Sequence, residues 1–283
     1  MADWLEFRAL VSRDGNSSAS ELRRALVAAG GDDGIPARTG AETDDEALAA
    51  SAFAEMDDRA RSSPDGYPFV TDGPILKTKP GVADCWSYLF CLLLSLKGAD
   101  RADVPDQPTG LFEEVAEVAA RTYVSGDSAK FGFPRRVLPG NFIAALDEIC
   151  VSIGEGKGGK RRPESKNAKD ARLDIVAWRP FPDRRPAQLI LFGQCAAGAN
   201  WQDKLTDLQP DCFVGLFLNE QFQVMPVRAF FTPFRLATEG WEVNARYGGI
   251  VFDRCRISHF AHAKPEPPGV VNWTRRTTAE LQK

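Results

Sequence analysis

The chain has 283 residues, of which 43% are hydrophobic and 26% are charged. These proportions are ordinary for a folded globular protein and exclude disorder along the whole chain. The formal net charge of −4 at pH 7 also excludes a polycation. If the protein binds nucleic acid, its basic residues must therefore be gathered in local clusters.

The cysteines and the apolar runs bear on the cellular compartment. No two cysteines form a CxxC pair, and several lie within apolar runs; they are Cys85, Cys91, Cys150, Cys195, Cys212 and Cys255. Scattered cysteines of this kind are typical of reduced, buried residues in a reducing compartment. The N-terminus lacks the pattern of a signal peptide, and the apolar run near residues 88–96 is shorter than the ~20 residues that span a bilayer. The sequence predicts a cytoplasmic protein with no membrane segment.

Residues 1–100 are predicted to form a mainly helical N-terminal region that regulates the protein or docks a partner. Its predicted elements are two helical pieces within residues 4–29, an amphipathic helix at 44–63, a strand pair around Asp72 and Gly73, and an apolar helix at 83–96. We expect the apolar helix to anchor this region to the rest of the fold and to leave an apolar patch for a partner protein. The polar segment 98–110, which contains two prolines and two glycines, is the predicted boundary.

An α/β domain is predicted over residues 110–262. In chain order, the pattern predicts helices at 111–124 and 141–156, a basic loop at 157–172, strands at 173–180 and 187–194, a short helix at 200–208, and strands at 212–218, 223–231 and 248–257. Residues 263–283 are predicted to be a loose C-terminal tail.

The strands at 173–180 and 187–194 are predicted to pair as a hairpin centred near Arg184. In that register Asp174 lies opposite Gln194, and directly opposed residues point to the same side of a sheet. Mg²⁺, or Mn²⁺ in its place, prefers oxygen ligands, often one or two carboxylates completed by water and substrate phosphate. Asp174, Gln194 and the backbone carbonyl of Cys195 could supply such ligands, which predicts a metal site at this end of the hairpin.

These residues carry a resemblance to the PD-(D/E)XK nuclease superfamily. A helix bearing Glu113 in LFEEVAEV, a strand bearing Asp174 in RLDIVAW and a second strand ending at Gln194 in LFGQCAAG resemble the Mrr-type branch, in which Gln replaces the acidic residue. The resemblance covers residues 110–218. It implies a restriction-endonuclease-like fold, with a mixed central sheet flanked by helices, and a Mg²⁺-dependent hydrolysis of DNA phosphodiesters in which Glu113, or Glu114 or Glu117 on adjoining helix faces, completes the metal shell.

One position departs from the family pattern. Where the family has a lysine two residues after Gln, this chain has Ala196. Lys204, on the following predicted helix, is the candidate to supply the missing ammonium group, as some members of the superfamily place the lysine there.

Basic residues near the predicted site are candidates for DNA contact. The sequence offers Arg135 and Arg136, and in the basic loop Lys160, Arg161 and Arg162. Such side chains bind backbone phosphates without selecting a base sequence. DNA rather than RNA is the predicted nucleic acid.

The function that these features favour is that of a metal-dependent DNA endonuclease that acts as an effector of a bacterial restriction or phage-defence system. The alternative is a nuclease-like module without activity that binds nucleic acid or serves as a scaffold, which Ala196 favours. A small-molecule hydrolase is weaker, because no nucleophile–base pair can be assembled; Cys195 lacks a well-placed histidine base. His259 and His262 are not predicted to hold zinc, since no Cys or carboxylate partner lies close in the sequence.

Overall fold

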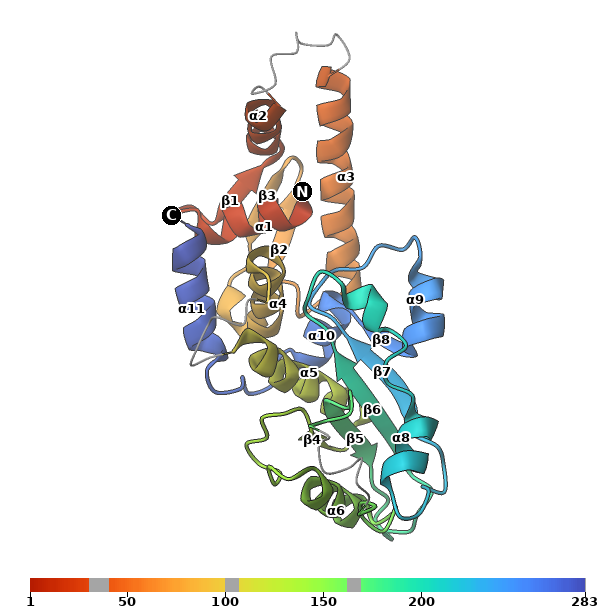
Figure 1. Ribbon diagram of the computed structural model, residues 1–283. Helices are drawn as coiled ribbons and strands as arrows, with labels where there is room; N and C mark the ends of the chain where they lie inside the picture. The colour runs from red at the N-terminus through yellow and green to blue at the C-terminus, as the bar shows by residue number, and fades with distance from the viewer. Residues whose placement is uncertain (31–40, 100–106, 162–168, 283) are drawn as a thin grey trace.

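The computed structural model describes residues 1–30, 41–99, 107–161 and 169–282. Among them, helices combine with a small three-stranded antiparallel sheet and a five-stranded mixed sheet (Figure 1). The predicted α/β class is confirmed. Most of the predicted boundary at 98–110 lies outside the described residues, and no described helix has the length and apolar character needed to cross a membrane.

The N-terminal region consists of the small sheet and the helices around it. Its elements are α1 (Ala2–Val11), β1 (Asn16–Ser18), α2 (Ala19–Gly30), α3 (Ala41–Ser62), β2 (Phe69–Asp72), β3 (Ile75–Thr78), the 3₁₀ helix η2 (Val82–Cys85) and α4 (Trp86–Lys97). The predicted strand pair is the β2–β3 hairpin, whose turn contains Gly73 with a φ of +54°. Glycine adopts this left-handed conformation without a steric penalty.

Helix α4 is buried on opposite sides and joins the N-terminal region to the rest of the fold. Phe90, Leu93 and Leu94 pack into a cluster with α5 and the large sheet, while Tyr88 and Leu92 pack against the N-terminal helices. The predicted anchoring role is confirmed. Little of this helix is left for the exposed apolar patch that the sequence predicted, because residues 86–94 are buried and Leu96 is the large apolar residue that stays exposed on it.

The large sheet begins as an antiparallel meander and ends with parallel strands. Its strand order is β4 (Asp127–Lys130), β5 (Ile175–Arg179), β6 (Leu189–Cys195), β7 (Val227–Phe231) and β8 (Ile250–Phe252). The β4–β5 and β5–β6 pairs are antiparallel, whereas β6–β7 and β7–β8 are parallel. The remaining elements are α5 (Pro108–Val124), α6 (Phe142–Ile153), the 3₁₀ helix η3 (Trp201–Lys204), α8 (Pro210–Phe217), α9 (Trp241–Gly248), α10 (Arg254–Ala261) and α11 (Val270–Leu281).

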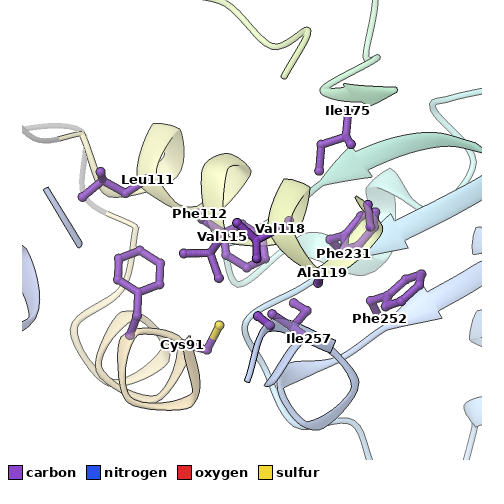
Figure 2. Packing of buried hydrophobic residues seen from close by; sticks show 14 of the residues in the cluster. Cys91, Leu111, Phe112, Val115, Val118, Ala119, Ile175, Phe231, Phe252 and Ile257 are labelled. Atoms are coloured by element: carbon purple, nitrogen blue, oxygen red, sulfur yellow. The ribbon is translucent and has the colours of Figure 1, made fainter. Parts of the chain in front are cut away.

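Alternate residues of the central strand β5 face two different apolar clusters. Ile175 and Ala177 pack with α5 and α10, and Figure 2 shows Ile175 near the α5 side chains. Val176 and Trp178 pack on the opposite side with α6 and α8. A sheet covered by helices on both faces produces continuous apolar strands such as these, because neither face meets solvent.

One predicted strand is wrong and another is shorter than predicted. Residues 212–217 belong to α8, which begins with Pro210 in its first turn, and Leu218 follows the helix in an extended conformation. A parallel pair such as β6–β7 needs a crossover connection, and α8 lies within it. The predicted strand 248–257 ends at Phe252, because the Asp253 side chain caps α10 by accepting a hydrogen bond from the Arg256 N–H at 3.0 Å.

The C-terminal residues are docked rather than loose. Trp273 of α11 is fully buried, and its ring centroid lies 4.9 Å from that of Phe90 on α4. A buried tryptophan holds the helix in place because its large apolar surface leaves water.

Replacing Trp273 by alanine is expected to lower the free energy of unfolding by about 3–5 kcal/mol, since the change leaves a cavity against α4. Val271→Ala, at a partly exposed site on the same helix, is the matched control and should cost less than about 1 kcal/mol. Urea denaturation measures both values. Equal effects of the two variants would contradict the docking of α11.

Candidate active site

Asp174 lies where β4, β5 and β6 meet. The predicted register is confirmed up to the last ladder pair, Ile175 opposite Gly193. Asp174 lies just outside this ladder, and its N–H donates to the Gly193 carbonyl at 2.9 Å. Its own carbonyl accepts from the N–H groups of Phe131 and Gly132 at 2.7 and 2.9 Å. The carboxylate oxygen Oδ2 accepts from the Cys195 N–H at 2.7 Å, so the backbone of β6 fixes the side chain.

Glu113 reaches the same place from α5. Its side chain is 15% exposed, and its Oε2 lies 3.1 Å from the Lys130 Nζ on β4. Oε2 accepts no hydrogen bond of normal geometry from the described residues. The backbone of Gly132 lies directly against this carboxylate, because a Cβ built at Gly132 would stand 2.4 Å from Oε2. Glycine is therefore required at position 132 if Glu113 is to keep this position.

Burial and neighbouring charges raise the pKa of both carboxyl groups. Burial raises the pKa of Asp174 well above its usual range, and the nearby charge of Glu113 raises it further. Burial also raises the pKa of Glu113 to about 7, although the Lys130 ammonium opposes the shift. Clefts in which burial and a specific neighbour shift a pKa are candidate functional sites.

Lys130 is the lysine that lies beside these carboxylates. Its Nζ donates to the Gly110 carbonyl at 3.0 Å and lies 3.8 Å from Glu114 Oε1. Lys204 ends η3, and no hydrogen bond or ion pair links it to Glu113 or Asp174 in the described part of the chain. Lys130 was not among the residues predicted from the sequence. The signal that could have found it is its position at the end of β4, the strand that pairs with β5, where it lies opposite Ile175, the residue after Asp174.

The side-chain carbonyl of Gln194 bonds to the backbone rather than joining the carboxylates of Glu113 and Asp174. The residue is 4% exposed, and its Oε1 accepts a hydrogen bond from the Leu208 N–H at 3.2 Å. Leu208 belongs to the apolar cluster on the α6 and α8 side of the sheet. The prediction that Asp174 and Gln194 converge as ligands is thus corrected: in the structure the acidic partner of Asp174 is Glu113.

Glu113 and Asp174 are the two side chains at this site that could hold a hard divalent cation. Glu113 and Asp174 provide carboxylate oxygens, and the buried Oε2 of Glu113 lacks a hydrogen-bond donor. No group of three or more His, Cys, Asp or Glu side chains in the described residues is placed to hold a metal ion. Two carboxylates with water and substrate oxygens are nevertheless a usual shell for Mg²⁺.

The remaining residues that were predicted to bind the metal are Cys195, Glu114 and Glu117. The group of Cys195 that was predicted to bind the metal is its backbone carbonyl; in the structure its N–H donates to Asp174 Oδ2 at 2.7 Å, and burial and the charge of Asp174 raise the pKa of its thiol. Glu114 lies 3.4 Å from Arg136, and Glu117 accepts a hydrogen bond from the Ser128 hydroxyl at 3.0 Å.

The predicted DNA-contact residues fall into two kinds. Arg135 is held in place, since its guanidinium lies 4.3 Å from the Phe131 ring centroid and donates to the carbonyls of Gly140 and Lys169. Lys160 donates to the Gly215 carbonyl at 2.5 Å. Arg136 and Arg161 have side chains that are largely exposed, and Arg162 lies outside the described residues.

Comparison with protein-family models, with curated proteins and with solved structures finds no match for this chain. The chemistry of the site must therefore be argued from the geometry of Glu113, Lys130 and Asp174.

The raised pKa of Glu113 gives a dependence of stability on pH in metal-free buffer. Between its ordinary pKa of 4.5 and about 7, folded Glu113 keeps a proton that the unfolded chain has lost. The contribution of this group to stability therefore falls as pH rises through that window. We expect Glu113→Gln, which cannot ionise, to gain about 1–3 kcal/mol over wild type between pH 5 and pH 7.5.

Urea denaturation at several pH values in the presence of a chelator measures this gain. Glu148→Gln, at an exposed site on α6, is the control and should follow the wild-type curve. A Glu113→Gln curve parallel to wild type would show that the carboxyl group is not buried as described.

Proposed function

We propose that this protein is a Mg²⁺-dependent nuclease that hydrolyses phosphodiester bonds in DNA. The observation that carries the proposal is the meeting of Glu113 and Asp174 beside Lys130. The carboxylates come from different elements and are largely buried, burial raises the pKa of both, and the charge of Glu113 raises that of Asp174 further, so an added cation would relieve the site.

The order of the elements supports the same proposal. Helix α5 bears Glu113, the next antiparallel strands bring Asp174 to the head of β5, and a hairpin leads to β6. This is the order implied by the resemblance to the PD-(D/E)XK superfamily, whose restriction-endonuclease-like fold is a mixed sheet flanked by helices. Because one fold can host many activities, the proposal depends on Glu113, Lys130 and Asp174 rather than on the fold.

Glu113 and Asp174 are the residues that would hold the metal. A bound Mg²⁺ would polarise the scissile phosphate and lower the pKa of a coordinated water. Asp174 is suited to this role because the backbone N–H of Cys195 orients its carboxylate before any ligand arrives. Gly132 leaves the space in which the Glu113 carboxylate lies.

In this proposal Lys130 supplies the positive charge that the family lysine would supply. Position 196, where that lysine is expected, holds a buried alanine in an apolar cluster with Leu205 and Phe230. The Lys130 ammonium approaches the carboxylates from β4 and can stabilise negative charge that develops on the phosphate. Lys204 is the alternative source of this charge, and the experiment below separates the two.

The biological setting of the proposal follows from the resemblance alone. It is an effector of a bacterial restriction or phage-defence system, with the N-terminal region as the contact for a partner protein. Exposed Arg136 and Arg161 would bind backbone phosphates.

A second candidate is a nuclease-like module without activity. The observation in its favour is that Gln194 is committed to the Leu208 N–H while position 196 is apolar. Such a module would bind nucleic acid or act as a scaffold, without cleaving.

Cleavage of plasmid DNA with Mg²⁺ or Mn²⁺ tests the proposal. We expect Asp174→Asn, Glu113→Gln and Lys130→Met each to lower the rate at least about a hundredfold, because each removes a charge that acts on the reacting phosphate or its metal. Lys204→Met is the matched lysine control and should keep the wild-type rate. Circular dichroism of each variant establishes that it is folded.

The remaining outcomes decide between the two candidates. If Lys204→Met loses activity and Lys130→Met keeps it, the assignment of the lysine is wrong. If the wild type binds DNA but cleaves none with either metal, the non-catalytic module replaces the nuclease.

A further inference from the structure

A cavity of about 380 Å³ adjoins the carboxylate site. It lies between α5, the edge strand β4, the loop at residues 136–138 and a proline-rich segment at residues 265–268. Its volume falls within the range of small-molecule sites in proteins. Glu113 and Asp174, the metal ligands of the proposed function, do not line it.

The cavity and the carboxylate site share a wall. Lys130 and Glu114 line the cavity, and the Lys130 Nζ lies 3.1 Å from Glu113 Oε2. A ligand in the cavity would therefore lie next to the place where the scissile phosphate is proposed to bind.

The charges of the lining favour an anionic ligand. Of the described lining residues, Arg121, Lys130 and Arg136 are cationic, against the carboxylates of Glu114 and Glu117. Glu114 is engaged by Lys130 at 3.8 Å and by Arg136 at 3.4 Å. Arginine side chains offer paired N–H donors that match the oxygens of a phosphate group.

The remaining walls suit a flat, partly polar ring. Val118, Leu138 and the segment with Pro265, Pro267 and Pro268 supply apolar surface. The Glu117 carboxylate, which accepts from the Ser128 hydroxyl at 3.0 Å, keeps further acceptor capacity because an ionised carboxylate has two oxygens and donates nothing. A ring that carries an amino group could donate to it.

We propose that this cavity binds one nucleotide of the substrate strand beside the scissile phosphate. The base lies against the prolines with its amino group directed to Glu117, and its phosphate lies at Arg121 and Arg136. This inference rests on the proposed nuclease function, and it adds to that function a site that prefers bases with an amino group over thymine.

Binding of the four deoxynucleoside 5′-monophosphates, measured by isothermal titration calorimetry on the full chain, tests the inference. The chain carries Asp174→Asn and no metal is added, so the result does not depend on cleavage. We expect dAMP, dCMP and dGMP to bind more tightly than dTMP. Arg121→Met should weaken binding about tenfold by removing a charged phosphate contact, whereas Arg246→Met, at an exposed site on α9, should leave it unchanged.

Glu117→Gln provides the second readout. An amide both donates and accepts, so this variant should reduce the preference against dTMP without abolishing binding of the phosphate. A merely structural role for Glu117 would instead weaken all four nucleotides alike.

The outcomes separate this inference from the proposed function. Absence of nucleotide binding, or binding that Arg121→Met leaves unchanged, overturns the nucleotide site even if the wild type cleaves DNA. Binding that follows the expected order, in a protein that cleaves nothing with Mg²⁺ or Mn²⁺, supports the site and rejects the nuclease.

Discussion

The backbone hydrogen bonds of Asp174 are the constraint on which the site depends. In the described part of the chain, its N–H bonds to β6, its carbonyl accepts from Phe131 and Gly132 after β4, and its carboxylate accepts from Cys195. These bonds join three strands at one residue. Because Asp174 and Gly132 are fixed together, the space that the Glu113 carboxylate occupies is fixed as well.

The cost of this arrangement is electrostatic. Taking carboxylates out of water opposes their ionisation, and placing them near one another opposes it again. Lys130 compensates only in part, because the pKa of Glu113 still rises to about 7. An apolar pair of similar volume would avoid this penalty, and the cation proposed for the site would reduce it.

The sequence could predict the parts of the site that follow from local pattern. Two apolar runs joined by a turn-rich link were enough to predict the β5–β6 hairpin and its register up to Ile175 and Gly193, and helical spacing was enough to place Glu113 on α5. Lys130 was missed because β4 is a short, polar edge strand without an apolar alternation. Gln194 could not be assigned because its partner, the Leu208 backbone, lies 14 residues away in the chain.

The errors in the fold have a similar cause. A short apolar run fits a buried strand and a buried helix equally well. Residues 212–217 belong to α8, which lies in the crossover that the parallel pair β6–β7 requires. The C-terminal prolines suggested a loose tail, yet Trp273 of α11 packs on α4 through a contact of long sequence separation.

The most direct test of the account is a titration of the metal-free protein with Mn²⁺, followed by electron paramagnetic resonance. The account predicts that the wild type binds an ion that Asp174→Asn and Glu113→Gln no longer bind, while Gln194→Ala still binds it. An ion that persists in both carboxylate variants, or no bound ion in the wild type, would contradict the claim that Glu113 and Asp174 form a metal site.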